Sequence, residues 1–254
     1  MLFFESSDVR IAYVDLVPRD QQIGTVLLVH GFASSHRINW IDTSWSKRLT
    51  EAGFRVIALD NRGHGESEKL YQKELYSPAI MAGDVIALMD HLKIQQADVM
   101  GYSMGARITA VLACRYPERV RRAVLGGLGI HLVEGNGLPP GIAEALEAPS
   151  LDDVREPVPR MFRAFADRTG GDRKALAACM RGSRHGLTRE EAAGIGVPLL
   201  ITVGTKDEIA GDPHALAALI PGAEAFDIVG RDHNLAVGDL THKDAVIAFL
   251  TKAS

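Results

Sequence analysis

The sequence predicts an α/β fold whose centre is a mostly parallel β-sheet flanked by helices. Short, continuous apolar runs alternate with helix-like segments over most of the chain, as in sheets whose strands are buried on both faces and joined by helical crossovers. Several of these runs end in glycine-rich or polar turns, which would meet at one edge of the sheet. With 254 residues, the chain is long enough for one large domain or for one domain with an inserted lid.

The strands and helices are expected from apolar patterning. Weak alternation over residues 2–17, interrupted by a turn at Ser6-Ser7-Asp8, predicts an antiparallel hairpin. A continuous apolar run at residues 25–29 and mainly apolar runs at 55–59, 97–100, 123–125, 197–203 and 225–229 predict buried strands. Helical spacing and stop signals predict helices at about residues 43–52, 78–92, 106–115, 213–220 and 240–252.

The alternation of strand and helix stops between residues 130 and 196. This stretch has no strand-like run, and five prolines fall between Pro139 and Pro159. Short helical pieces are expected at residues 141–148, 158–166 and 174–181. We therefore expect a single α/β domain over residues 1–254. Its core comprises residues 1–129 and 197–254, and a small helical lid is inserted at about 130–196.

Composition and charge argue against several classes of protein. A formal net charge of −4 and the lack of an overall basic stripe give no indication of nucleic-acid binding. Apolar runs such as Val26–Val29 are far too short to cross a bilayer, and the N-terminus does not resemble a signal peptide. Cys114 and Cys179 have no metal-binding or redox spacing and are expected to be small buried side chains. A small-molecule partner and a cytoplasmic location are therefore expected.

The segment Gly101-Tyr102-Ser103-Met104-Gly105 lies between a predicted strand and a predicted helix. A G-x-S-x-G pattern in this context indicates a sharp turn, called a nucleophile elbow, that exposes a serine hydroxyl at its tip. The two flanking glycines are expected because a Cβ atom at either position would clash where the strand reverses into the helix. The pattern by itself is common by chance, so its meaning depends on whether other residues complete a catalytic site.

A serine hydroxyl is a poor nucleophile at neutral pH, and it needs a histidine to take its proton and a carboxylate to orient that histidine. Ser103, Asp207 and His233 each follow the carboxyl end of a predicted parallel strand, and their order along the chain is the one expected for a serine on such an elbow. We therefore predict that these three residues form a catalytic triad.

Other residues compete for these roles. Asp207 could instead cap a helix or form an Asx turn. Asp212 and Asp227 are alternative acids, although Asp227 lies inside a predicted strand, and Asp232 is expected to cap a turn. The alternative bases, none of which follows the last predicted strand, are His64, His185, His214 and His242.

Taken together, the motifs resemble those of the serine α/β-hydrolase superfamily over nearly the whole chain. They are His30-Gly31-Phe32, Asp60-x-Arg62-Gly63-His64-Gly65-x-Ser67, Gly101-x-Ser103-x-Gly105, Gly204-x-x-Asp207 and Asp232-His233. The resemblance implies an α/β-hydrolase fold with a mostly parallel eight-stranded sheet and a helical cap inserted after strand 6.

The resemblance also implies roles for individual residues. Ser103 would be the nucleophile, His233 the general base and then acid, and Asp207 its orienting carboxylate, with no metal or organic cofactor. The backbone N–H groups of Phe32 and Met104 would form the oxyanion hole. In the loops around them, His30 would brace the oxyanion segment, and Arg62 with Asp60 would shape a turn rather than bind substrate.

The expected activity is hydrolysis of a carboxylic ester or lactone of small or medium size through an acyl-enzyme. One alternative is hydrolysis of a C–C or amide bond in a carboxylate-bearing metabolite, and another is a non-catalytic receptor for a small ligand. Epoxide hydrolases and haloalkane dehalogenases of this fold use an aspartate at the elbow, so Ser103 argues against both.

The substrate itself is poorly indicated by the sequence. Ser34, His36 and Tyr102 are candidates to line the substrate pocket. The insertion carries nine Lys or Arg against three Asp or Glu between Arg155 and Arg189, and such a basic lid could attract an anionic substrate. A solvated helix surface would give the same composition.

Overall fold

The computed structural model describes residues 1–135 and 138–252, and within these ranges eight strands form one sheet. The spatial order is β1-β2-β4-β3-β5-β6-β7-β8. Only the β1–β2 and β2–β4 pairs are antiparallel, which confirms the mostly parallel eight-stranded sheet. The strands are β1 (Leu2–Ser6), β2 (Val9–Leu16), β3 (Gly24–Val29), β4 (Phe54–Leu59), β5 (Ala97–Tyr102), β6 (Val120–Gly126), β7 (Leu199–Gly204) and β8 (Glu224–Ile228).

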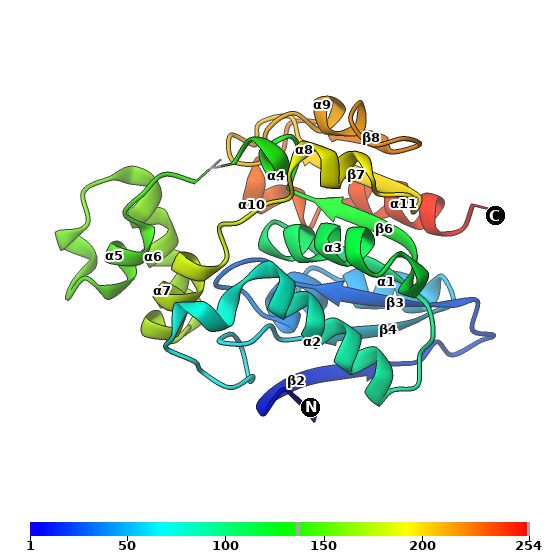
Figure 1. Ribbon diagram of the computed structural model, residues 1–254, viewed down its shortest axis with the longest axis horizontal. Coiled ribbons are helices and arrows are strands. Elements are labelled where there is room, and N and C mark those ends of the chain that lie inside the picture. Colours follow the sequence, from blue (N-terminus) through cyan, green and yellow to red (C-terminus); the bar gives the residue numbers. More distant parts are fainter. Residues whose placement is uncertain (136–137, 253–254) are drawn as a thin grey trace.

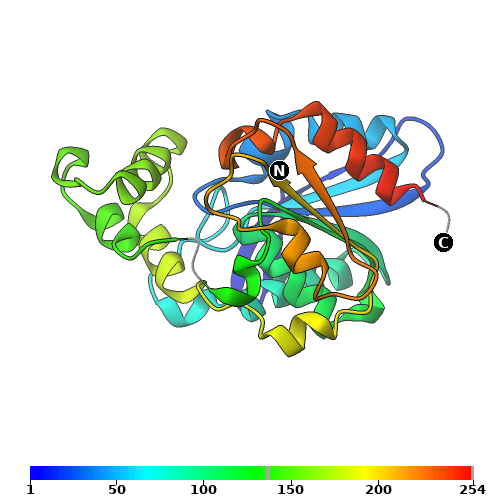
Figure 2. The same cartoon turned by 90° about the horizontal axis from the view of Figure 1, so that it is seen from above.

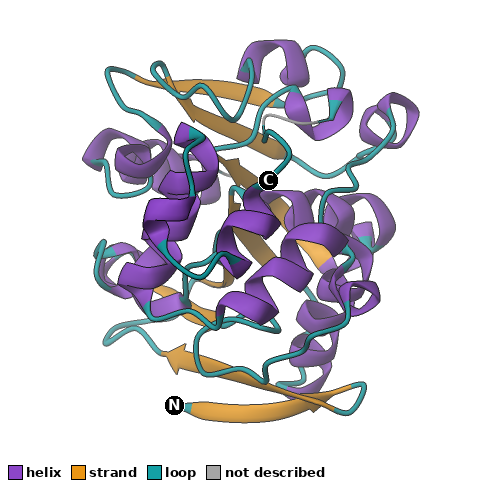
Figure 3. Cartoon of the chain, turned by 90° about the vertical axis from the view of Figure 1, so that its left-hand side faces the viewer, coloured by secondary structure: helices purple, strands orange, loops and turns teal. Residues whose placement is uncertain are grey.

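Helices cover both faces of the sheet (Figure 1). One face carries α2 (Pro78–His91), α3 (Met104–Arg115) and α9 (Pro213–Ala217), while α1 (Trp45–Glu51) and α11 (Leu240–Leu250) lie on the other. The hairpin β1–β2 closes one edge of the sheet (Figure 3). The expected helices are all present, and shorter turns add η1 (Arg37–Ile41), η2 (Lys73–Tyr76), η3 (Pro117–Arg119), η4 (Leu151–Asp153) and α10 (His233–Ala236).

The central strands are buried on both faces, so their side chains alternate between two apolar cores. In β3, Leu27 and Val29 pack into the core beneath α2 and α3, whereas Val26 and Leu28 pack into the core beneath α1 and α11. Because successive strand side chains point to opposite faces, a strand in this position needs an uninterrupted apolar run. This is why the sequence indicates β3 to β7 so clearly.

The described residues of the insertion between β6 and β7 form helices joined by turns and loops, with no strand. It contains α4 (His131–Glu134), α5 (Ile142–Glu147), α6 (Pro157–Thr169), α7 (Arg173–Gly182) and α8 (Arg189–Ala193). Helices α5, α6 and α7 project from one end of the core (Figures 1 and 2).

The two ends of the insertion belong to the core rather than to the projecting part. Before α4, the N–H of Ile130 donates to the carbonyl of Asp212 in the loop after β7. Near α8, the Cys114 thiol of α3 donates to the Glu191 carbonyl. The part of the insertion that projects from the core therefore starts after α4 and ends before α8. The two cysteines are free thiols, of which Cys179 is buried as expected and Cys114 is only half-buried.

A buried ion pair ties the loop after β4 to α2 and to the N-terminal hairpin. Asp84 accepts hydrogen bonds from Arg62 Nε and Nη2, both at 2.7 Å, and from Ser6 Oγ at 2.6 Å. The Arg62 and Asp84 side chains are 3% and 2% exposed. Arg62 pairs with Asp84, whereas Asp60 accepts hydrogen bonds from His36 and from the N–H of Glu66 in the loop after β4. The expectation that Arg62 shapes its loop fits this network.

Three fully buried histidines are held neutral. Burial lowers the pKa of His242 to about 4, of His30 to about 4 and of His64 to about 3. His242 Nδ1 lies 3.1 Å from the Ala236 carbonyl and its Nε2 lies 2.9 Å from Thr202 Oγ1. Nδ1 must therefore carry the proton, and Nε2 accepts from the threonine hydroxyl.

We predict that the free energy of unfolding falls as the pH is lowered from about 6.5 towards 4. Between these pH values the unfolded chain binds protons at the three histidines and the folded protein does not. Each histidine therefore lowers the free energy of unfolding by about 1.4 kcal/mol for every unit by which the pH falls. Urea unfolding across this range should show a shallower pH slope for His242→Gln than for the wild type. The exposed His185→Gln is the control and should keep the wild-type slope. Equal slopes in all three proteins would contradict the prediction.

Within the described ranges, no helix is both long enough and apolar enough to span a membrane.

Candidate active site

Ser103 sits at the tip of a sharp turn between β5 and α3. Its backbone has φ 55° and ψ −112°, a conformation that costs about 1–3 kcal/mol and persists only where its surroundings enforce it. A Cβ at Gly101 would lie 2.0 Å from the Gly105 carbonyl oxygen, and one at Gly105 would lie 2.0 Å from the Val29 carbonyl oxygen. The steric reason predicted for the two glycines is confirmed.

The structure brings Ser103, His233 and Asp207 together in one hydrogen-bonded chain. His233 Nε2 lies 2.9 Å from Ser103 Oγ, and His233 Nδ1 lies 2.7 Å from Asp207 Oδ2. Because the ionised Asp207 can only accept, Nδ1 carries the proton and Nε2 accepts from the serine hydroxyl. The Asp207 side chain is fully buried, and its Oδ1 accepts from the N–H groups of Ile209 and Ala210. Asp207 thus makes the Asx-type turn of the rival interpretation and orients His233 as well.

The competing residues are engaged elsewhere. Asp212 caps α9, Asp232 caps α10, and Asp227 on β8 pairs with His214. His64 Nδ1 contacts the Arg62 carbonyl inside the loop after β4, and His242 lies beneath the sheet against Thr202. Neither the other acids nor these histidines contact Ser103.

The loop after β3 lies directly against the serine. A Cβ at Gly31 would be 3.6 Å from Ser103 Cβ, and the Gly31 N–H donates to Asn39 Oδ1 at 2.7 Å. His30 braces this loop as predicted, since its Nε2 accepts from the Asn61 N–H at 3.0 Å and its Nδ1 lies 2.7 Å from the Gly31 carbonyl.

The two predicted oxyanion donors are available. Among the described residues, the N–H groups of Phe32 and Met104 donate to no protein acceptor. Met104 begins α3, so the unpaired N–H groups and the positive end of the helix dipole lie beside the serine.

Two cavities meet at Ser103 and share Phe32 and Phe162. The wide cavity has a volume of about 610 Å³ and reaches the lid residues Met161, Phe165 and Arg168. The narrow cavity has a volume of about 60 Å³ and runs along α3 towards Arg107 and Arg184. A substrate whose reactive carbonyl sits at Ser103 could place one part in each cavity.

The three predicted substrate residues have different positions. Ser34 and Tyr102 line the wide cavity. The Tyr102 hydroxyl donates to the His233 carbonyl at 2.6 Å, so this side chain also supports the backbone of the histidine. His36 is not brought to either cavity, because its Nδ1 lies 2.8 Å from the buried Asp60 carboxylate. As a substrate residue, His36 does not fit the structure.

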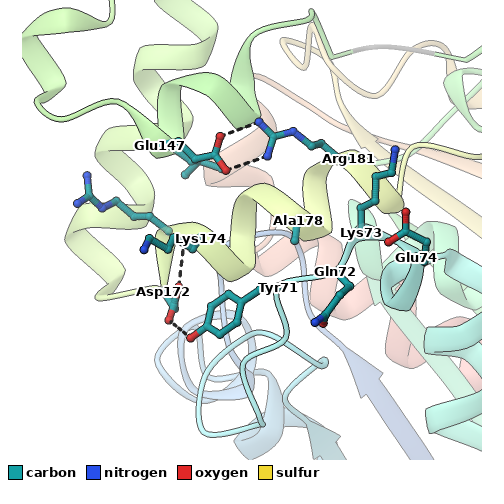
Figure 4. Close-up of a pocket in the computed structure, with 11 residues that line it drawn as sticks. Tyr71, Gln72, Lys73, Glu74, Glu147, Asp172, Lys174, Ala178 and Arg181 are labelled. Atoms are coloured by element: carbon teal, nitrogen blue, oxygen red, sulfur yellow. Dashed lines mark hydrogen bonds and ion pairs between the residues drawn. The ribbon is translucent and has the colours of Figure 1, made fainter.

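Much of the positive charge counted between Arg155 and Arg189 is neutralised by acidic residues that precede this stretch in the chain. Arg181 pairs with Glu144 and Glu147 of α5, and Arg189 pairs with Glu134 of α4. Figure 4 shows Arg181 facing Glu147 in a cleft between η2 and α7, where the Tyr71 hydroxyl donates to Asp172 at 3.1 Å. None of Ser103, Asp207 and His233 lines this cleft. An overall basic lid face is therefore not a feature of the folded protein.

Sequence reasoning missed the residues of the narrow cavity. Phe162, Met180 and Arg184 come from the insertion, whose packing cannot be inferred from apolar periodicity alone. Arg107 could have been found, because it follows Ser103 by four residues on a predicted helix and so shares its face. Within the described ranges, no group of three or more His, Cys, Asp or Glu is arranged to hold a metal ion.

Comparisons with known proteins agree with this architecture. A family model described as the alpha/beta hydrolase fold matches residues 24–169. The solved enol-lactonase of Burkholderia xenovorans superposes with a TM-score of 0.78 at 25% identity, covering 99% of this chain and 100% of the enol-lactonase.

Curated relatives are matched over shorter stretches. Epoxide hydrolase B of Mycobacterium tuberculosis is 37% identical over 113 residues, which cover 43% of this chain and 30% of that protein. The 3-oxoadipate enol-lactonase 2 of Acinetobacter baylyi is 28% identical over 65% of this chain and 67% of its own length. The chain thus spans about a third of the length of the epoxide hydrolase.

Proposed function

The chain belongs to the α/β-hydrolase fold family, and from this premise we propose that it is a serine hydrolase that cleaves a carboxylic ester or lactone through an acyl-enzyme on Ser103. One observation carries the proposal. The Ser103 hydroxyl, at a strained turn between two cavities, is hydrogen-bonded to His233, which is hydrogen-bonded to the buried Asp207.

In the first step, Ser103 Oγ forms a bond to the substrate carbonyl carbon while His233 Nε2 takes the hydroxyl proton. Asp207 keeps the proton of Nδ1 in place and stabilises the imidazolium. The negative charge that develops on the carbonyl oxygen is met by the N–H groups of Phe32 and Met104. Each such donor contributes about 3 kcal/mol to the transition state in comparable sites.

The second half of the reaction reverses these roles. His233 gives its proton to the departing alkoxide, so that the C–O bond of the ester breaks and the alcohol leaves. Water then enters, His233 Nε2 takes its proton, and hydroxide attacks the acyl group on Ser103. Collapse of the second tetrahedral intermediate releases the carboxylic acid and returns the proton to Ser103.

Epoxide hydrolysis fits these residues poorly, although an epoxide hydrolase is among the relatives. If Ser103 Oγ opened an epoxide ring, the product would be an ether, which has no carbonyl carbon for the activated water to attack. The enzyme would stop after one turnover. An ester or lactone instead leaves an acyl group that the same residues can hydrolyse, and the names of two enol-lactonases among the similar proteins support the lactone as a substrate class.

Hydrolysis of a C–C or amide bond is the runner-up within this fold. Its support in the sequence was the basic lid, and the ion pairs of Arg181 and Arg189 remove most of that support. We propose the insertion at residues 130–196 as the lid of the site, because its residues Phe162, Met180 and Arg184 line the narrow cavity together with Ser103. A small-molecule substrate and a cytoplasmic location remain predictions.

The proposed function predicts that a fluorophosphonate probe labels Ser103 stoichiometrically and that labelling abolishes hydrolysis of methyl esters and lactones together. Intact-protein and peptide mass spectrometry locate the label, and a kinetic panel that also contains amides and vinylogous keto acids ranks the bond classes. Labelling without turnover of any ester or lactone would move the proposal to the C–C or amide class. A protein that is inert to the probe but binds small ligands would favour the receptor alternative.

A further inference from the structure

We propose that the narrow cavity beside Ser103 binds a carboxylate group of the substrate through the guanidinium groups of Arg107 and Arg184. The inference rests on the proposed ester or lactone hydrolysis and names its substrate class. That class is an ester or lactone that carries a second, free carboxylate a few bonds away from the reactive carbonyl.

Arg107 is placed by the helix that begins at the elbow. Arg107 lies in the first turn of α3, and its backbone N–H donates to the carbonyl of Ser103 at 3.1 Å. Both line the narrow cavity. An anionic group bound at Arg107 would therefore be separated from a carbonyl at Ser103 by a short carbon chain.

The Arg107 guanidinium has no partner among the described residues. Its Nη1 is buried and donates no hydrogen bond, and no carboxylate lies within ion-pair distance. Burial alone lowers the pKa of Arg107. Arg107 as a whole is half-buried, and the three fully buried arginines differ from it in being satisfied: Arg62 pairs with Asp84, Arg163 pairs with Asp167, and Arg122 donates to the carbonyls of Leu250 and Lys252.

An unpaired buried cation is costly, and a bound anion would remove the cost. Breaking a buried ion pair by deleting one partner typically costs about 3–5 kcal/mol, because the remaining charge is left desolvated. Arg107 is half-buried, with its Nη1 inaccessible and without a partner, so the cost that it carries is smaller than this figure. A carboxylate matches it well, since the planar guanidinium can donate two parallel hydrogen bonds to the two carboxylate oxygens.

The remaining cavity walls suit the same ligand. Arg184 also lines the cavity, its Nη2 donating to the Pro139 carbonyl at 2.8 Å, and it makes no ion pair among the described residues. His131 Nδ1 lies 2.8 Å from the Ile209 carbonyl, so its imidazole is oriented by the loop after β7. No Asp or Glu lines the cavity, and apolar side chains such as Leu128 and Phe162 complete it. A volume of about 60 Å³ suits a carboxylate on a short stem rather than a long acyl chain.

The test compares matched methyl esters that differ in one terminal group. Monomethyl glutarate carries a carboxylate where methyl pentanoate carries a methyl group, and hydrolysis of both is followed in a pH-stat. The wild type should prefer the acid ester by kcat/KM. In Arg107→Met, the ratio of the two kcat/KM values should fall by about 10- to 100-fold, the usual loss for a charge-assisted hydrogen bond. Arg107→Lys keeps the charge but loses the planar, two-pronged guanidinium, so its ratio of kcat/KM values should lie between those of the wild type and Arg107→Met.

Arg115→Met is the matched control, because Arg115 ends the same helix but is exposed to solvent. It should keep the wild-type ratio. Thermal unfolding is a second measurement, and it distinguishes a ligand-binding role of Arg107 from a purely structural one. Arg107→Met removes an unpaired and partly buried charge, so its Tm should be at least that of the wild type. Glutarate should raise the Tm of the wild type and of Arg115→Met but not the Tm of Arg107→Met.

A binding measurement separates this inference from the proposed function. Calorimetric titration of glutarate into Ser103→Ala protein requires no turnover. Binding that weakens at least tenfold in the Ser103→Ala/Arg107→Met protein would support the inference even if no ester were hydrolysed. A wild type whose Ser103 is labelled and which hydrolyses esters, but which shows neither a preference for the acid ester nor glutarate binding, would overturn the inference and leave the proposed function standing.

Discussion

Ser103→Ala is expected to lower kcat for ester hydrolysis by about four to six orders of magnitude while the protein stays folded. The substitution removes the only atom that can form the acyl-enzyme, and triad residues act as a unit, so little of their joint effect survives the loss of one member. Residual activity would come from water activated by His233 and from the Phe32 and Met104 donors. The fold should be preserved because alanine and serine have the same backbone demands at φ 55°.

The measurement is single-turnover and steady-state kinetics with a methyl ester, accompanied by thermal unfolding. Ser35→Ala serves as the control, since Ser35 lies in the neighbouring loop, accepts the Ile38 N–H and lines neither cavity. It should retain activity within about twofold. Substantial ester turnover by a well-folded Ser103→Ala protein would remove Ser103 from the mechanism.

Asp84→Ala is expected to lower the free energy of unfolding by about 3–5 kcal/mol, although Asp84 lies outside the active site. It leaves Arg62 buried without its counter-charge and deprives Ser6 of its acceptor. Asp90→Ala on the same helix breaks the Asp90–Arg119 pair, in which the aspartate side chain is 63% exposed, and should cost less than about 1 kcal/mol.

Urea unfolding at pH 7 compares the two variants with the wild type. Asp84→Ala should shift the midpoint strongly, and Asp90→Ala should leave it nearly unchanged. If both variants lost the same small amount, the Arg62–Asp84–Ser6 network would not be the tie between the N-terminal hairpin and α2 that its burial indicates.

The sheet was predictable because a strand that is buried on both faces consists mostly of apolar residues, a pattern that is visible in the sequence. Strands β3 to β7 are almost continuous apolar runs, and the turns at their carboxyl ends carry Ser103 and Asp207 at one edge. His233 follows β8 in the same way, so strand order and edge chemistry were enough to bring the three residues together. The two glycines beside Ser103 were predictable for the equally local reason that a tight turn excludes a Cβ atom.

The predictions that failed depend on contacts between segments far apart in sequence. His36 turns towards Asp60 instead of the cavity. The buried pair of Arg62 with Asp84 on the next helix was likewise not indicated by the sequence. The charge of the lid could not be judged from a window that excluded Glu134, Glu144 and Glu147. The role proposed for Arg107 depends on which acceptors are missing around it, and a missing contact has no signature in a sequence.

The way the insertion joins the sheet bears on how its specificity can be re-engineered. Strands β6 and β7 pair directly, with Ala123 opposite Leu199 and Gly126 opposite Thr202, so the ladder does not depend on the helices placed between them in the chain. The ends of the insertion are held by core contacts at Ile130 and Glu191. We therefore expect that the stretch from α5 to α7 can be exchanged without loss of the sheet, provided that the replacement keeps an apolar contact such as that of Cys179 with Met104. A different helical segment inserted between these two anchors would change the side chains that line both cavities. The positions of Ser103, His233 and Arg107 would be unchanged, because they belong to the core.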